Sequence, residues 1–504
     1  MSDLALLGLV MLLVMIGAIF IGFPISFTLL FLALTFGYVG LGEMVFNLAY
    51  FQTIGLMKEE LLAAVPLFIF MGFVTEQAGL MERLFRAFRD VFAPIRGSLY
   101  AVVILTAAVF AMATGIVGAA VTVLGIMASP IMIKTGYDGR LAAGAITAGG
   151  TLGILIPPSV MLIVMGPVIG VSVAELYAAA FGPGFLLAGI YLAYLLGRSF
   201  VNPRLGPPVP PQERTHGFAR ILGEVLLGVV PLFALIAATL GSILAGLATP
   251  TEASAIGALG ALVLAAAYRR LSLAGLKRAL LATTTTSSMV LLLAVTSNIF
   301  GAVFARLGTA NWITETMLAL PLSPLAMLLV VLVLIFLLGW PFEWPAIILV
   351  FLPIFYPVMD ALKGELGAAL GLAPDMVMIW FGALVAVTLQ TAFLSPPVAM
   401  SAYYLRQVVR QWSLATIYKG MLEFMLLQVL AIALIVTFPA IATRLPEQLR
   451  AEAAAMKTEE VDDSAHRLED DPMKAGQEEE AKEEEAEEDA LEQDDLGKAA
   501  RRKK

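Results

Sequence analysis

The sequence predicts an all-α polytopic membrane protein made of two inverted repeats, and three observations support this. Sixty per cent of the 504 residues are hydrophobic, and uncharged runs long enough to cross a bilayer recur along the chain. Two of these runs, residues 141 to 174 and 376 to 405, each contain a Pro-Pro pair. Each half divides into about five crossings plus one re-entrant hairpin, and an odd number of crossings inverts the second half relative to the first.

The first repeat is expected over residues 1 to 200. Its uncharged stretch 97 to 133 is too long for one crossing of about 20 residues and short for two, which predicts a re-entrant hairpin. Small residues near 113 to 122 allow close backbone approach at the hairpin tip. A broken helix follows at 141 to 168. The remaining crossings are expected at 4–22, 25–42, 61–79 and 176–197, with interfacial helices at 43–60 and 81–96.

The second repeat is expected over residues 221 to 443, after a proline-rich cytoplasmic linker at 201 to 220. It repeats the plan with a hairpin at 324 to 359 and a broken helix at 376 to 405. The remaining crossings are expected at 225–242, 253–268, 279–305 and 424–443, with an interfacial stretch at 269–278. Residues 444 to 504 hold 21 acidic and 11 basic side chains, which predicts a disordered acidic tail or at most a solvated helix.

Loop charges orient this layout. The arginine-rich segments belong on the cytoplasmic side by the positive-inside rule. All of them fall on one side of the predicted topology: 81–96, 198–220, 269–278 and 406–419. Both termini are therefore expected outside, with the first hairpin entering from the cytoplasm and the second from the far side.

Composition excludes several classes of protein. Residues 1 to 443 hold 18 acidic and 20 basic side chains, so there is no basic face for nucleic acid. The chain has no cysteine, and its two histidines, His216 and His466, lie in the linker and the tail. A membrane-embedded enzyme would need a nucleophile with a base, or a metal cluster, and only carboxylates such as Glu343 remain. Such an enzyme stays a remote alternative, and no cofactor is expected.

The two Pro-Pro segments point to a transport site. Proline lacks an N–H donor and clashes with the preceding turn, so Pro157-Pro158 and Pro396-Pro397 interrupt their helices. Backbone groups freed inside a membrane must be buried in protein or line a polar cavity. One such break could equally be a packed kink, but two at matching places in two halves favour a site for ions and substrate.

Four segments resemble a known family, the large membrane subunit of tripartite ATP-independent periplasmic (TRAP) transporters, within the ion transporter superfamily. The first and last of them are specific motifs, and the resemblance covers residues 1 to about 443. The segments are Gly150-Thr151-Leu152-Gly153-Ile154-Leu155-Ile156-Pro157-Pro158-Ser159, residues 64 to 72, Thr249-Pro250-Thr251-Glu252-Ala253, and Gln390-Thr391-Ala392-Phe393-Leu394-Ser395-Pro396-Pro397.

The resemblance implies a multi-pass protein of the bacterial inner membrane that imports organic acids with a sodium gradient. The acids would be carboxylates such as dicarboxylates, 2-oxo acids or sialic-acid-like substrates. It also implies a small four-helix membrane subunit, a periplasmic substrate-binding protein and an elevator mechanism.

One motif departs from the family pattern. Many members have Gly-Ser-Ser at the first hairpin tip, whereas this chain has Thr114-Gly115-Ile116-Val117-Gly118, so backbone carbonyls must carry more of any ligation there.

Sodium needs several oxygen ligands, and helix breaks with Thr and Ser hydroxyls are the abundant source here. We therefore expect two sodium sites with substrate between them. The first joins the hairpin tip to the first break: Thr114, Gly115, Gly118, Thr122, Gly150, Thr151 and Gly153. The second joins the second hairpin to the second break: Trp340, Glu343, Gln390, Thr391 and Ser395. The expected substrate positions are Pro157, Pro158, Ser159, Pro396 and Pro397.

Some assignments have plainer alternatives. An intramembrane carboxylate such as Glu343 is by default functional, but it could instead pair at a hairpin mouth near water. Glu252 is interpreted as a structural acid at a helix N-terminus, and hydroxyls of 283 to 288 as bonding to their own helix rather than lining a path. An organic-anion channel, or a carrier that needs no binding protein, remains the alternative function.

Overall fold

The computed structural model describes residues 2–208, 218–396 and 399–469. The chain divides into two compact units, Met1–Pro446 and Glu447–Lys504. Within the described residues the regular elements are helices, and ten of them are long and apolar enough to cross a membrane. The predicted all-α polytopic class is confirmed.

The first half of unit one consists of α-helices and two short 3₁₀ turns within the described residues. The helices are α1 (Asp3–Ile21), α2 (Ile25–Leu41), α3 (Met44–Met57), the 3₁₀ turn η1 (Glu60–Ala63), α4 (Ala64–Gln77), α5 (Leu80–Phe92), α6 (Ser98–Thr114), α7 (Val117–Lys134), α8 (Gly139–Thr151), the 3₁₀ turn η2 (Leu152–Ile154), α9 (Val160–Val168) and α10 (Val173–Val201).

The second half has a similar order of elements. It contains α11 (Phe218–Ile236), the π-helical η4 (Ala237–Gly241), α12 (Ser242–Leu244), α13 (Pro250–Ala267), α14 (Leu273–Arg306), α15 (Thr309–Leu318), α16 (Pro324–Leu338), α17 (Trp344–Ala346), the π-helical η5 (Ile347–Phe351), α18 (Leu352–Leu370), α19 (Pro374–Gln390), the 3₁₀ turn η6 (Thr391–Phe393), α20 (Met400–Val408), α21 (Leu414–Thr437) and α22 (Ala440–Glu469).

Local sequence explains where these helices begin and end. Ser2 caps α1 by accepting a hydrogen bond from the Ala5 amide, and Gly22 ends it at φ 104°. At α13 the Thr249 side chain accepts from the Glu252 amide while the Glu252 carboxylate accepts from the Thr249 amide, and Pro250 takes the first helical position. This reciprocal capping box confirms the structural interpretation of Glu252.

Three segments differ from the expected boundaries. The stretch 269–278 is not a separate interfacial helix along its whole length, because α14 runs without interruption from Leu273 to Arg306. The second arm of the second hairpin continues to Leu370 rather than ending at 359. Residues 444 to 469 are helical in α22, and the disorder expected beyond 469 concerns residues outside those described.

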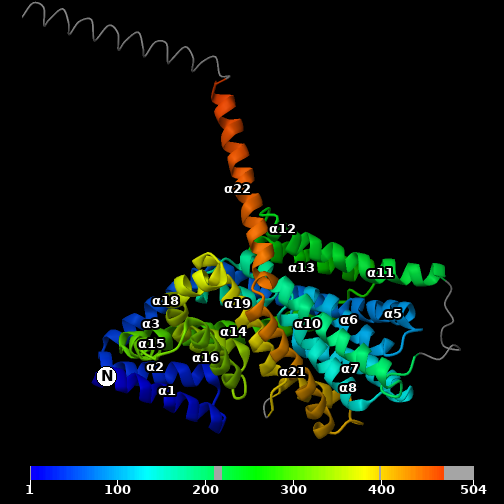
Figure 1. Ribbon diagram of the computed structural model, residues 1–504, viewed down its shortest axis with the longest axis horizontal. Helices are drawn as coiled ribbons and strands as arrows, with labels where there is room; N and C mark the ends of the chain where they lie inside the picture. The colour runs from blue at the N-terminus through cyan, green and yellow to red at the C-terminus, as the bar shows by residue number, and fades with distance from the viewer. Residues whose placement is uncertain (1, 209–217, 397–398, 470–504) are drawn as a thin grey trace, which may run out of the picture. The chain divides into compact units, whose positions relative to one another are not determined.

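The contacts between helices of the first unit divide them into two groups. In one group α4 lies against α13 and α14, α5 against α11, and α1 and α2 against α15 and α14 respectively. In Figure 1, α1, α2, α3 and α15 of this group lie on the left, and α5 and α11 lie on the right. In the other group, α8 lies against α6, α7 and α21, α10 against α19 and α21, and α20 against α7. The first group contains helices α1 to α5 and α11 to α15, and the second contains the hairpins and the broken helices. Each group therefore takes matching elements from both halves.

Glycine permits the close contact between α8 and α21. A methyl group on Gly420 would lie 2.1 Å from the Arg140 carbonyl oxygen and 2.9 Å from the Gly144 amide nitrogen. A methyl on Gly144 would in turn meet the Phe424 ring at 2.6 Å. The backbone atoms of a helix cannot move away as a flexible side chain can. The close packing of α8 on α21 therefore requires glycine at positions 144 and 420.

We expect Gly420→Ala to destabilise the protein by about 1–3 kcal/mol, because the added methyl overpacks a backbone contact. The measurement is the thermal denaturation midpoint of the purified protein. Gly189→Ala on α10 is the matched control, since a methyl there meets no atom within 4 Å. Equal midpoints for the two variants would contradict this account of the α8–α21 contact.

Candidate functional site

The first break lies between α8 and α9, and its side chains are buried. The α-helix ends at Thr151, passes through the turn η2 and starts again at Val160. Thr151 is fully buried and donates its hydroxyl to the Ala148 carbonyl at 2.8 Å, while Ser159 donates to the Ile154 carbonyl at 2.5 Å. The Tyr177 hydroxyl of α10 donates to the Ser159 carbonyl at 3.4 Å. Hydroxyl groups therefore donate hydrogen bonds to backbone carbonyl oxygens at and near the break.

The first hairpin tip meets this break. Gly115 joins α6 to α7 at φ +61°, a conformation that favours glycine. A methyl group placed on it would lie 3.6 Å from the Pro158 carbonyl oxygen and 3.8 Å from that of Gly153. Further along, Gly150 packs on Val121, whose amide nitrogen would lie 3.1 Å from an added methyl. The structure thus brings Gly115 next to Gly153 and sets Gly150 against the first hairpin, whereas Gly118 packs on Tyr404 of α20.

The second break repeats this chemistry between α19 and α20. Thr391 begins the turn η6 and donates its hydroxyl to the Thr388 carbonyl at 2.6 Å, the same three-residue reach as Thr151. The Ser395 hydroxyl lies 2.7 Å from the Thr391 carbonyl oxygen and 3.3 Å from the Met425 sulfur of α21. Thr391 and Ser395 are buried, whereas Pro396 is half-buried and Pro397 lies outside the described residues.

The second hairpin turn meets the second break. The turn runs from Gly339 to Glu343, and a methyl on Gly339 would lie 2.9 Å from the Ala392 side chain. Trp340 is 43% exposed and packs on Phe336, while Glu343 is half-buried and precedes α17 without capping it. The turn therefore contacts the second break through Gly339, whereas the Trp340 ring is partly exposed at the surface of the protein.

Each hairpin also contacts the half-helix that follows the other repeat's break. Helix α7 of the first hairpin packs on α20, and η5 of the second packs on α9. Gly118 makes room for the first contact, because a methyl there would lie 2.9 Å from the Tyr404 ring. Tyr404 of the second repeat thus faces the first hairpin.

Two buried polar side chains at the second break have no hydrogen-bond partner in the part of the chain that the structure describes. Both amide atoms of Gln390, at the last residue of α19, and the hydroxyl of Ser401, in the first turn of α20, are unpaired. Each residue is 0% exposed. Burying such groups without a partner is costly, so their position at a break is typical of a binding site.

The ends of the helices at the breaks determine the sign of the electrostatic potential there. Helices α6 and α8 both end near Gly115, and α16 and α19 both end near Gly339, so two C-termini meet at each hairpin turn. A helix C-terminus carries roughly half a negative charge, spread over its unpaired carbonyl oxygens. These two places are suited to a cation.

The remaining predicted residues are partly described. Thr122 is half-buried on α7, and nothing is described of the Thr114 side chain. Within the run 283–288, Thr284 and Thr285 donate to their own helix at Leu280 and Leu281, as the structural interpretation predicted. Thr283 and Ser287 instead carry buried hydroxyls without a hydrogen-bond partner among the described residues.

Sequence reasoning missed four residues of the site. Tyr177 and Met425 touch the breaks, Ser401 lies in the half-helix after the second break, and Tyr404 touches the first hairpin. Tyr404 lies seven residues after Pro397, so the half-helix following the Pro-Pro pair could have been searched for it. Tyr177 and Met425 belong to α10 and α21, which follow the breaks in the chain, and no local pattern marks them as neighbours of Ser159 and Ser395.

Comparison with known proteins gives the family. The model for the tripartite ATP-independent periplasmic transporter, DctM component, matches residues 9–441. The chain is 29% identical to the sialic acid TRAP transporter large permease protein SiaM of Vibrio cholerae, over 86% of this chain and 96% of that protein. It is 31% identical to the C4-dicarboxylate TRAP transporter large permease protein DctM of Pseudomonas aeruginosa, over 77% of this chain and 86% of that protein.

A solved structure shares the fold. The crystal structure of the Alcanivorax borkumensis YdaH transporter, described as having an unusual topology, matches 78% of this chain and 88% of its own with a TM-score of 0.54. Its sequence identity is 16%, so the likeness concerns the fold alone. Together with the family match and the ten apolar helices, this confirms the resemblance seen in the motifs. The chain belongs to the DctM family of tripartite ATP-independent periplasmic transporters, as a multi-pass inner-membrane transporter subunit and not an enzyme.

Proposed function

We propose that this chain is the large membrane subunit of a sodium-coupled, binding-protein-dependent importer of organic acids. The observation that carries the proposal is the meeting of two helix C-termini at each hairpin turn, next to a broken helix whose hydroxyls and carbonyls are buried. Sodium ions would bind at these two places as coupling ions, with Thr151 and Thr391 beside the carbonyl oxygens.

The organic acid would bind between the two sodium sites. The helical segments that start near the breaks and turns, at Val117, Val160, Trp344 and Met400, present N-terminal ends that attract a carboxylate. Tyr404, Ser401 and Gln390 supply donors next to them. The named relatives transport sialic acid and C4-dicarboxylates, and both substrates carry carboxylate groups.

An elevator movement of one helix group against the other fits the packing. A row of three cavities of about 390, 250 and 310 Å³ lies between α3, η1 and α14 on one side and α9, η5 and α18 on the other. Neighbouring cavities share residues: Glu59 and Pro167 in one case, Gln52, Asn298 and Leu349 in the other. Cavities along this part of the boundary leave fewer contacts to break when one group slides past the other.

The partners and the orientation belong to the same proposal. A small four-helix membrane subunit and a periplasmic binding protein would complete the transport system, with both termini of this chain on the periplasmic side.

An organic-anion channel is the alternative function. Uptake in proteoliposomes that saturates and requires a purified binding protein supports the carrier, whereas rapid ohmic conductance supports the channel.

We expect Thr151→Val and Thr391→Val each to raise the sodium concentration needed for half-maximal uptake by about five- to tenfold, because valine keeps the shape but removes an oxygen. The measurement is C4-dicarboxylate or sialic acid uptake into proteoliposomes containing both membrane subunits and the binding protein. Thr284→Val is the control, since its hydroxyl is exposed and bonds its own helix. Unchanged sodium dependence in both site variants, with normal amounts of protein, contradicts the assignment.

The chain has no cysteine, so an introduced pair gives a clean test of the movement. Cross-linking Asn298→Cys on α14 to Leu349→Cys on η5 with a bis-methanethiosulfonate reagent, which forms a disulfide with each thiol and releases methanesulfinate, should lower uptake roughly tenfold or more, and reduction should restore it. The control pair is Glu60→Cys with Thr251→Cys, within one helix group, where the Thr251 hydroxyl donates to the Glu60 carbonyl at 3.1 Å. Full transport by the cross-linked seam pair would rule out the elevator.

A further inference from the structure

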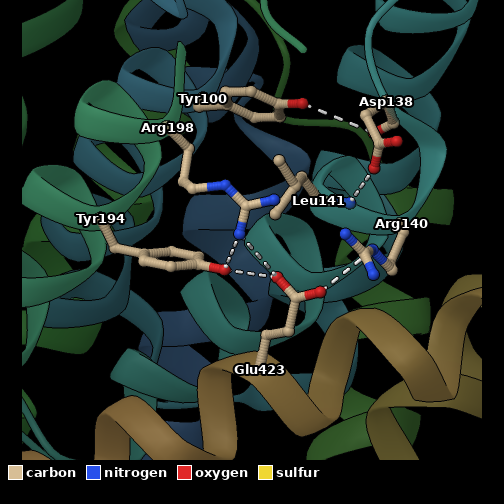
Figure 2. A network of polar contacts seen from close by, with 7 residues as sticks. All are labelled: Tyr100, Asp138, Arg140, Leu141, Tyr194, Arg198 and Glu423. Atoms are coloured by element: carbon tan, nitrogen blue, oxygen red, sulfur yellow. Dashed lines mark hydrogen bonds and ion pairs between the residues drawn. The ribbon is translucent and has the colours of Figure 1, made fainter. Parts of the chain in front are cut away.

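A carboxylate on α21 joins three helices of the hairpin-containing group (Figure 2). Glu423 Oε1 lies 3.0 Å from Nε of Arg140 in α8, and its Oε2 lies 3.8 Å from a terminal nitrogen of Arg198 in α10. The Tyr194 hydroxyl donates to the same Oε2 at 2.5 Å and accepts from Arg198 at 2.8 Å. One acid therefore holds two guanidinium groups and a phenol.

Arg140 needs this partner because of its place in the chain. It stands in the first turn of α8, two residues after the cap residue Asp138, whose carboxylate accepts from the Leu141 amide at 2.9 Å. A positive charge is unfavourable at a helix N-terminus. Glu423 is only 20% exposed, so its pairing is screened less than that of a surface ion pair. Without Glu423, both guanidinium groups would lose their carboxylate partner, and Arg198 would keep its hydrogen bond to Tyr194.

The same helix is tied to the second break. Met425, two residues after Glu423, lies 3.3 Å from the Ser395 hydroxyl. Further along α21, the Ile435 carbonyl accepts from the Trp380 ring nitrogen of α19 at 3.1 Å. Gly420, three residues before Glu423, touches the α8 backbone. Helix α21 thus contacts the helix that leads to the first break and the segment that forms the second.

We propose that Glu423 is a positioning residue through which α21 couples the two sodium sites. By holding Arg140 and Arg198 it fixes the start of α8 against α21, and α21 in turn supports Ser395 through Met425. Binding of sodium at one break then changes the affinity of the other, because both breaks are braced by one helix. The inference rests on the proposed sodium sites and adds the link between them.

The test is radioactive sodium binding to the purified full chain, with the binding curve measured for wild type, Glu423→Gln and the swapped pair Arg140→Glu with Glu423→Arg. We expect a cooperative wild-type curve, and in Glu423→Gln a Hill coefficient near one with half-saturation raised roughly two- to thirtyfold. The swapped pair should recover part of the cooperativity. Asp360→Asn is the matched control, because it breaks the Asp360–Lys363 pair on α18 at 2.7 Å without touching α21.

A second readout needs no sodium. A cysteine introduced at the buried Ala145 of α8 should react with a maleimide faster in Glu423→Gln than in Asp360→Asn, because the start of α8 is loosened. Absence of sodium binding in wild type would count against the proposed function, while this labelling comparison would still decide the bracing role. A wild-type Hill coefficient in Glu423→Gln, or equal labelling rates in the two variants, would overturn the inference.

Discussion

Backbone groups cannot be left unpaired in hydrocarbon, and this constraint governs the arrangement of the chain. Two helices break in this protein, so their free carbonyl and amide groups must be covered by other parts of it. The breaks are buried, Thr151 and Thr391 each bond back to a carbonyl three residues earlier, and a hairpin turn closes over each break through glycine. The hairpins are therefore the structural complement of the breaks, and the oxygens that remain between them become available to ions.

The two halves share this plan but differ in chemistry. Helix α9, after the first break, is apolar throughout, whereas α20, after the second, carries Ser401, Tyr404 and Arg406. In the first half, residues 44–77 form three separate elements, α3, η1 and α4. The corresponding segment of the second half is the single helix α14, which has 34 residues. Since Tyr404 lies against Gly118, the polar half-helix of the second repeat also contacts the hairpin of the first. Equal architecture with unequal side chains is what a transporter needs if sodium and an organic acid are to bind between its halves.

Much of the fold could be predicted because its signals are local. Uncharged runs, Pro-Pro pairs and small-residue tips stand in the sequence next to the structures they cause, and so a hairpin near Gly115 and breaks near Thr151 and Thr391 could be expected from the sequence. The capping role of Glu252 was also readable from Thr249 and Pro250. The contacts of Tyr404 with Gly118, of Met425 with Ser395, and of Glu423 with Arg140 were not predicted, because each joins residues far apart in the chain. The length of α14 was not predicted, because the charged residues near its start indicated an interfacial stretch before the crossing, whereas the helix continues through them.

The central claim is that the two breaks with their hairpin turns are the places where sodium binds. Amide hydrogen exchange of the purified protein, compared in sodium and in choline at equal ionic strength, tests this most directly. The account predicts slower exchange with sodium at residues 115–122, 149–160, 339–346 and 390–396, with no change in α11 and α13. Exchange that is identical in the two salts at all four segments, or slowed only in α11 and α13, would contradict it.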